Sequence, residues 1–118
     1  MWRHFQVPGR LNMATEFRRI TFNHDELRRA IENHKSNGNV PEGEISIIRS
    51  KRKNGQNGYE IEAFDPKKSK VQQIFIAEDN ALEMLIESCL LARIALPRVA
   101  RKLVREIDSH LCLDLITE

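Results

Sequence analysis

The chain of 118 residues lacks the features that mark several specialised classes of protein. Its two cysteines, Cys89 and Cys112, lie among apolar residues without CxxC spacing, which argues against a disulfide scaffold of the secreted kind. No apolar run approaches the roughly 18 residues of a membrane span, and the first residues contain no continuous apolar segment of a signal peptide. We therefore expect a cytoplasmic protein with two buried, reduced thiols.

Neither sign of charge dominates, since 19 basic and 17 acidic residues give a net charge of +2. Any attraction to nucleic acid or anionic lipid must therefore be local. The length suits one domain, and we assign it to residues 16–118. Residues 1–15 have no regular pattern, and Met13 directly precedes the first patterned segment. We predict a disordered leader over residues 1–15, with Met13 as an alternative translation start.

The first patterned segment, FRRITFN (17–23), alternates between two faces and is rich in β-branched and aromatic residues, so a strand is predicted. Asn23 followed by Glu26 is typical of a capped helix start. The apolar residues that follow recur at helical spacing to about Asn37, and Gly38 is the expected left-handed cap.

The middle of the chain has the pattern of a β-hairpin. The segments EISIIRSKRK (44–53) and GYEIEAF (58–64) flank two Asn-Gly pairs, and Asn-Gly is the strongest short-range hairpin signal because both residues tolerate positive φ. VQQIFIA (71–77) is predicted as the strand that returns after the next turn.

A second helix is predicted over residues 81–94, with Asp79 or Asn80 as its cap. It is apolar nearly all round, which is typical of a helix that is central or lies at an interface. Met84 and Leu91 are seven residues apart and fall on a common side, beside the inward stripe. We expect these two residues either to form the surface of a homodimer or to be covered by the C-terminal segment.

The C-terminal segment has two interpretations. A hairpin over residues 103–116, with its turn at Asp108 and Ser109, is favoured by the alternation of leucine with other residues in LCLDLI. Apolar residues also recur at every fourth position over 98–107, and Pro97 suits the first turn of a helix. A third helix over 98–107 therefore stays open.

The two halves of the chain resemble each other. Residues 20–41 and 74–97 both contain a strand, an acidic helix start, a helix and an aliphatic residue before proline, at an offset of about 55. This pattern suggests a duplicated β-α-β-β unit. We predict an α+β fold with a mainly antiparallel sheet of five or six strands and two helices on one face. The alternative has four strands and three helices.

The segment from Leu85 to Leu115, which contains RIALPRVARKL and LCLDLI, resembles a group of small uncharacterised bacterial proteins. That group shares an R-I-x-L-P-R-x-A-x-K stretch and has IPLPR where this chain has IALPR, so Ala95 departs from the pattern. The resemblance implies a small protein of unknown function and carries over no catalytic residue.

Basic residues in two regions provide a candidate nucleic-acid surface. They come from the first hairpin and from the segment before the last one: Lys51, Arg52, Lys53, Arg98, Arg101, Lys102 and Arg105. The competing interpretation is that these side chains solvate the polar faces of their elements, which the balanced charge and the lack of interleaved aromatic residues favour.

The sequence contains no GxSxG, P-loop, dinucleotide-binding or H-E-x-x-H motif. The paired acids Glu60 and Glu62, and Glu83 and Glu87, have the spacing of ordinary solvent-exposed faces. We expect no cofactor, no metal site and no enzymatic activity. The function predicted is that of a small non-enzymatic binding module, whose partner is another protein or a second copy. The alternative is a nucleic-acid-associated regulatory protein.

Overall fold

A computed structural model of the chain describes residues 16–34 and 40–117. The predictions of a leader over 1–15, of a start at Met13 and of a cap at Gly38 lie outside the described residues. The described part is an α+β fold, as predicted. Its elements are, in order, β1 (Glu16–Phe22), α1 (His24–Asn33), β2 (Glu44–Lys53), β3 (Gln56–Asp65), β4 (Lys70–Ala77), α2 (Glu78–Leu91), β5 (Arg101–Ile107) and β6 (His110–Thr117).

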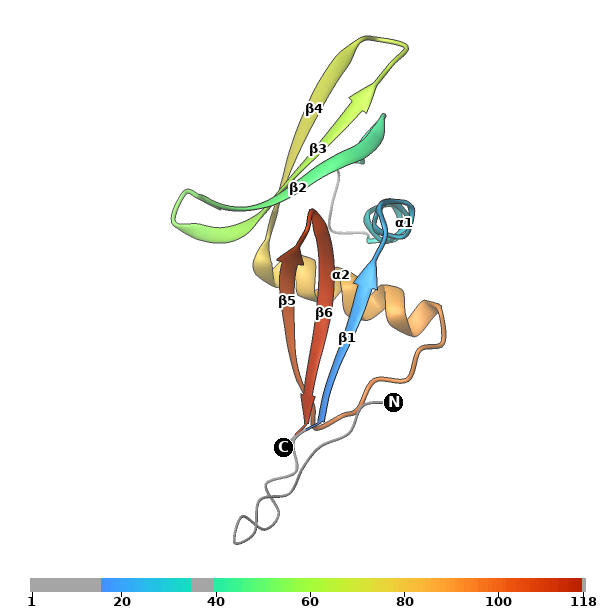
Figure 1. Ribbon diagram of the computed structural model, residues 1–118, viewed down its shortest axis with the longest axis vertical. Helices are drawn as coiled ribbons and strands as arrows, with labels where there is room; N and C mark the ends of the chain where they lie inside the picture. The colour runs from blue at the N-terminus through green and yellow to red at the C-terminus, as the bar shows by residue number, and fades with distance from the viewer. Residues whose placement is uncertain (1–15, 35–39, 118) are drawn as a thin grey trace, which may run out of the picture.

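The strands form two antiparallel three-stranded sheets instead of the one sheet expected (Figure 1). Sheet A has the order β1-β6-β5, and sheet B has the order β2-β3-β4. The predicted order β-α-β-β occurs twice along the chain, but the first strand of each unit pairs with the hairpin of the other unit. Alternation within a strand shows which of its side chains share a face, but it does not identify the neighbouring strand. The sequence therefore did not predict the division into two sheets.

Helix α1 begins as the sequence predicts. The Asn23 side chain accepts a hydrogen bond from the Glu26 backbone N–H (2.7 Å), and the Glu26 carboxylate accepts one from the Asn23 backbone N–H (2.9 Å). This reciprocal capping box satisfies two backbone donors at the helix start. The helix ends at Asn33, earlier than predicted, and His34 is its C-terminal cap residue.

Helix α2 begins differently from the prediction. It starts at Glu78 directly after β4, with Ala77 in the capping position and no side-chain cap, so the assignment of Asp79 or Asn80 as the cap is wrong. No loop residue separates the strand from the helix, and both candidates therefore lie inside the first turn. Glu78 and Asp79 still interact favourably there with the positive end of the helix dipole.

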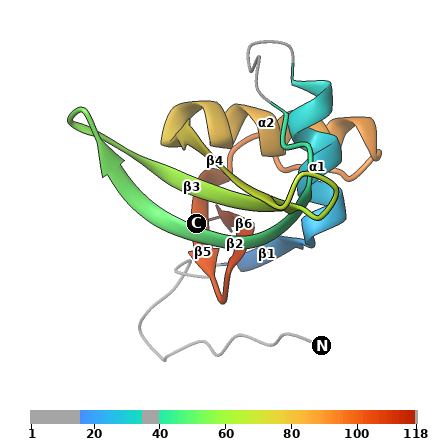
Figure 2. The same cartoon turned by 90° about the horizontal axis from the view of Figure 1, so that it is seen from above.

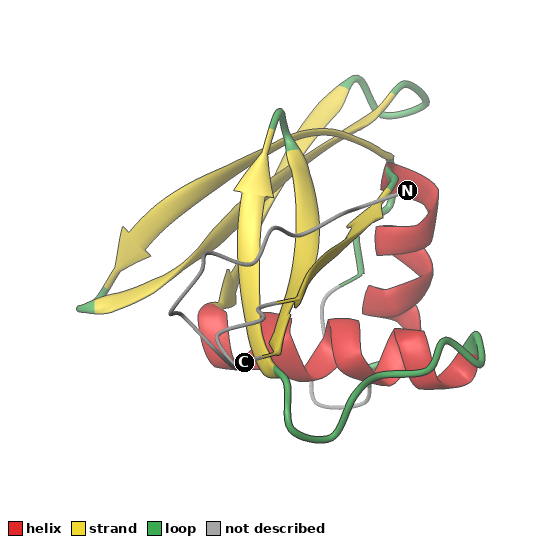
Figure 3. Cartoon of the chain, turned by 60° about the horizontal axis from the view of Figure 1, so that its bottom comes forward, coloured by secondary structure: helices red, strands yellow, loops and turns green. Residues whose placement is uncertain are grey.

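Helix α2 contacts strands of both sheets and also contacts α1 (Figure 3). Its inward face meets the leucines of β6, Leu111, Leu113 and Leu115, in one hydrophobic core. The buried residues of α2 recur at helical spacing and form this inward face: Ala81, Met84, Leu85 and Cys89.

This packing corrects the predicted self-association surface. Met84 is only 1% exposed and belongs to the core, so it does not lie on a surface. Leu91, in the last turn of α2, is 63% exposed. A homodimer through Leu91 stays a prediction, and Met84 has no part in it.

The β2–β3 and β5–β6 hairpins each turn through two residues of positive φ, the geometry that suits the twist of paired strands. These are Asn54 (51°) and Gly55 (79°) in the first hairpin, and Asp108 (50°) and Ser109 (64°) in the second. The predicted C-terminal hairpin is confirmed, because β5 pairs with β6 along its whole length. The alternative of a helix over 98–107 is wrong.

The turn of the second hairpin joins the two sheets. The Ser109 hydroxyl accepts a hydrogen bond from the Ile48 backbone N–H (2.7 Å) and donates one to the Ile48 carbonyl (3.3 Å). One side chain of the turn between β5 and β6 thus pairs with backbone groups of β2, and Figure 2 shows sheet B extending across this end of sheet A. The link holds β5 beside sheet B.

Candidate anion-binding groove

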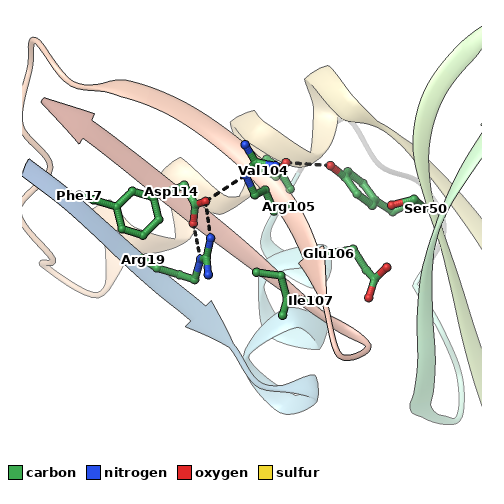
Figure 4. Close-up of a pocket in the computed structure, with 9 residues that line it drawn as sticks. Phe17, Arg19, Ser50, Val104, Arg105, Glu106, Ile107 and Asp114 are labelled. Atoms are coloured by element: carbon green, nitrogen blue, oxygen red, sulfur yellow. Dashed lines mark hydrogen bonds and ion pairs between the residues drawn. The ribbon is translucent and has the colours of Figure 1, made fainter. Parts of the chain in front are cut away.

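A cavity of about 560 Å³ lies between β5 and sheet B (Figure 4). We call it the arginine groove. Strands of both sheets contribute to its lining, which consists of Phe17, Arg19, Ser50, Tyr59, Val104, Arg105, Glu106, Ile107 and Asp114.

The central feature of the arginine groove is the carboxylate of Asp114, whose side chain is fully buried on the middle strand of sheet A. Arg19 lies directly opposite on β1 and holds both carboxylate oxygens, with Nε–Oδ1 at 2.7 Å and Nη2–Oδ2 at 2.9 Å. Arg105 on β5 approaches from the other side, with Nε–Oδ2 at 3.2 Å. Hydrogen bonding to Asp114 raises the pKa of the Arg19 guanidinium above its usual value.

The two arginines carry more charge than Asp114 neutralises. Arg19, Arg105 and Asp114 together carry one net positive charge, and the Glu106 carboxylate in the same lining brings the formal charge of the groove to zero. Each guanidinium has five N–H donors; Arg19 donates two of them to Asp114, and Arg105 forms an ion pair with the same carboxylate. Their side chains are 37% and 56% exposed, so the remaining donors face space that a ligand can enter.

The other polar groups of the groove have structural partners. Tyr59 is buried, and its hydroxyl donates a hydrogen bond to the Val104 carbonyl (3.0 Å). Burial raises the pKa of Tyr59 to about 12, so its hydroxyl stays protonated at neutral pH. The Glu106 carboxylate accepts a hydrogen bond from the Ser109 backbone N–H (3.0 Å). Tyr59 shapes the groove, and Glu106 adds a negative charge to its lining.

Sheet B carries a comparable ionic network on β2 and β3. Glu60 accepts a hydrogen bond from Lys51 (2.6 Å) and lies 3.3 Å from Arg49 Nε, and Arg49 also binds Glu62 (2.6 Å). The hydrogen bond from Lys51 lowers the pKa of Glu60, and the charge of Arg49 contributes to the same shift. Two basic and two acidic side chains balance here, so the network has no surplus charge.

Three of the predicted nucleic-acid residues lie on β2, and each contacts another side chain of sheet B. Lys51 belongs to the ionic network just described. Arg52 Nη1 donates to Asn57 Oδ1 (3.3 Å), and Lys53 Nζ lies 5.8 Å from the centre of the Phe75 ring.

The other predicted basic residues also fail to share one surface. Lys102 donates hydrogen bonds to the carbonyls of Pro97 (3.1 Å) and Ala100 (3.2 Å), which fastens the loop before β5. Arg98 is exposed in that loop, and Arg101 is exposed at the start of β5. Arg105 alone among the seven reaches the arginine groove.

Sequence reasoning missed Arg19 and Asp114 as site residues. One signal was present, since Asp114 is the single charged residue in the otherwise apolar stretch LCLDLI. An acidic side chain in a central strand requires a basic partner, because an unpaired buried charge is costly. The partner itself is 95 positions away in the chain, beyond the reach of local patterns.

Among the described residues, no three His, Cys, Asp or Glu side chains gather in a way that would hold a metal ion. The described helices are all too short or too polar to cross a membrane.

No protein-family model matches the chain, and no curated protein or solved structure is significantly similar to it. The resemblance of residues 85–115 to small bacterial proteins therefore stays a prediction.

Proposed function

We propose that the protein is a small non-enzymatic binding module, and that the arginine groove holds an anionic group of its partner. The observation that carries this proposal is the pair of guanidiniums held on the buried carboxylate of Asp114, with side chains that are 37% and 56% exposed. Arginine stays protonated in proteins, so it is suited to binding carboxylates and phosphates and unsuited to proton transfer.

The form of the groove supports the same conclusion. It is an open hollow of about 560 Å³ with a lining that is more polar than apolar, which suits a charged group of a partner. Asp114 holds Arg19 by two hydrogen bonds and Arg105 by an ion pair, so both guanidiniums are oriented before a ligand arrives. Such pre-organisation reduces the entropy that binding would cost.

We place this binding activity in the cytoplasm, as the sequence predicts. Cys89 and Cys112 are free and buried in the described part of the chain. Free thiols persist in a reducing compartment. Burial raises the pKa of Cys89, which favours its unreactive protonated form.

Thermal unfolding in the presence of small dianions tests the proposal. A ligand that binds only the folded state raises Tm in a saturable manner. We expect glutarate or inorganic phosphate to raise the Tm of the unaltered protein above that in chloride of equal ionic strength. Arg105→Gln should abolish this rise, and Arg49→Gln, in the balanced network of sheet B, should retain it. An equal rise in all three proteins would contradict a specific site.

A nucleic-acid-associated role is the second candidate, because a cavity of about 340 Å³ with Lys51 and Arg52 in its lining shares Ser50 and Tyr59 with the arginine groove. Phosphates could follow this path towards Arg105. Fluorescence anisotropy with a labelled single strand and a labelled duplex, from about 50 to 200 mM salt, tests it. Affinity that falls steeply with salt would support this role, and the absence of binding at the lowest salt would exclude it.

A further inference from the structure

The edge of β4 that faces away from β3 differs from the other free strand edges of the molecule. We propose that β4 pairs with β4 of a second copy of this chain, antiparallel and about a two-fold axis, so that the two copies share one continuous sheet. No residue of β4 lines the arginine groove. This dimer and the anion site are therefore separate proposals, and either can fail without the other.

The outward edge of β4 is open. β4 (Lys70–Ala77) is the outermost strand of sheet B on the side away from β2 (Figure 1), and it pairs with β3 over its whole length. In the described part of the chain, the backbone groups on its other edge form no hydrogen bond with a strand, a turn or a side chain. Such an edge offers a row of donors and acceptors to another strand.

The other three edges are obstructed. On β5, the Tyr59 hydroxyl occupies the Val104 carbonyl. On β2, the Ser109 hydroxyl occupies both backbone groups of Ile48, and the pairing of this strand with β3 contains a register shift. β1 carries two adjacent arginines. Bound backbone groups, irregular pairing and charged side chains all hinder the addition of a strand.

β4 has none of these obstructions. From Val71 to Ala77 it contains no charged residue, no proline and no glycine, and its pairing with β3 has no register shift. Valine, isoleucine and phenylalanine, which favour strands, make up much of the segment. A regular, uncharged edge of this kind is one that proteins ordinarily cover, and no described element covers it here.

The charges at the two ends of β4 select a second copy of the same strand. Exposed basic residues lie at its start and exposed acidic residues follow its end: Lys67, Lys68 and Lys70 at the start, and Glu78 and Asp79 at the end. Among the described residues, only Lys68 of these five forms an ion pair, with Glu42 (2.9 Å). An antiparallel pair brings the basic start of each strand towards the acidic end of the other, and a parallel pair would bring like charges together. Charges of opposite sign attract over roughly 10 Å at 0.1 M salt, so the antiparallel arrangement is favoured without direct contact.

Pairing through β4 also ends the association at two copies. Once the two β4 edges are joined, the shared sheet terminates on both sides in β2, whose edge is occupied by the Ser109 hydroxyl. The assembly is therefore closed, as most oligomers are. Val71, which is 52% exposed on β4, would be partly covered by the added strand.

Sedimentation equilibrium tests the inference, with Gln73 as the position to change. Gln73 is exposed near the middle of β4, so a two-fold axis places it opposite or diagonal to Gln73 of the second copy. We expect the unaltered protein to reach twice the monomer mass of 13.7 kDa as its concentration rises.

Gln73→Lys and Gln73→Glu should each raise the Kd of the dimer up to about fivefold, because like charges then meet across the axis. An equimolar mixture of the two variants should associate at least as well as the unaltered protein, since opposite charges now meet. Gln56→Lys, at the exposed start of β3 and away from this edge, should leave Kd unchanged. Restoration by mixing also shows that neither variant has merely lost its fold.

Amide hydrogen exchange of the unaltered protein gives a second measurement. Alternate residues of a strand direct their N–H groups to the same edge, so dilution of the dimer should speed exchange at alternate residues of β4 and leave β2 unchanged. A monomer mass at millimolar concentration would overturn the inference, as would exchange in β4 that is independent of concentration. A dimer that Leu91→Glu disrupts and both Gln73 variants leave intact would place the contact on α2 and exclude the β4 edge.

Discussion

Each sheet has an acidic side chain on its middle strand, but the basic partners of that side chain come from different strands in the two sheets. In sheet A, Asp114 on β6 is bound by arginines from both flanking strands, Arg19 of β1 and Arg105 of β5. In sheet B, Glu60 on β3 is bound by Arg49 and Lys51, which both come from β2. Opposite Glu60 on β4 lies Phe75, where sheet A has Arg19 opposite Asp114.

The comparison shows how a repeated fold can produce one site. Each sheet combines the first strand of one β-α-β-β unit with the hairpin of the other. Arg19 comes from the first unit, whereas Arg105 and Asp114 come from the second. The cluster of Arg19, Asp114 and Arg105 therefore depends on the exchange of strands between units. In sheet B the same exchange places Phe75, which has no charge, opposite Glu60.

The largest expected effect comes from cutting the chain in the turn between β3 and β4, into residues 1–67 and 68–118. Each fragment would retain one hairpin and a first strand whose partner is missing, and an isolated hairpin is at best marginally stable in water. We expect each fragment alone to show no cooperative thermal transition by circular dichroism. An equimolar mixture should regain the transition. A fragment that unfolds cooperatively as a monomer would refute the interdependence of the units.

The two acidic residues should differ in their effect on stability. Asp114→Asn weakens three charge-assisted contacts of a fully buried group, and we expect a loss of about 2–3 kcal/mol in the free energy of unfolding. Glu60→Gln should cost less, because its partners are about half exposed and water can replace it. Urea denaturation of both variants measures the difference. Equal losses would remove the contrast between the sheets.

Acidic pH should affect the network of sheet B through Glu60. Its pKa in the folded protein is below the ordinary value of 4.5, so its contribution to stability is present above about pH 4.5. That contribution is lost as the pH falls through the lower folded pKa. Denaturation of the unaltered protein and of Glu60→Gln from neutral to acidic pH should give stability curves that converge on acidification. A constant gap between them would show that the carboxylate charge is irrelevant.

The smallest effect is expected at the end of α2, beyond the region that joins the two sheets. Leu91 is 63% exposed, and Leu91→Glu should change the free energy of unfolding by no more than about 0.5 kcal/mol. Met84, which is buried between the sheets, serves as the control, because Met84→Ala should cost about 2–5 kcal/mol. A large loss in Leu91→Glu, measured at low protein concentration, would mean that this end of the helix is covered.

Local patterns in the sequence predicted the elements well. The capping box of Asn23 and Glu26, the hairpin turn at Asn54 and Gly55, and the alternation in LCLDLI each depend on neighbouring residues, and the structure contains all three. The order β-α-β-β was also visible twice. The start of α2 was misplaced because its capping position holds an alanine that makes no side-chain hydrogen bond.

The sequence did not predict which distant strands pair with each other. Arg19 and Asp114 are opposite each other only because β1 joins the hairpin of the second unit. The dense basic run Lys51–Lys53 was predicted to contact nucleic acid. In the structure its three side chains contact other side chains of sheet B. The density of charge in a sequence does not show which charges remain available for a partner.

The central claim is that Arg19 and Arg105, held together on Asp114, bind an anion in the arginine groove and that Arg49 of sheet B does not. Nuclear magnetic resonance of the ¹⁵N-labelled protein can follow the Nε–H groups of Arg19, Arg49 and Arg105 in one titration with glutarate, against chloride of equal ionic strength. We predict saturable shifts at Arg19 and Arg105, with Arg49 moving no more than it does in chloride. Parallel, saturable shifts at Arg49 and Arg105 would contradict the claim.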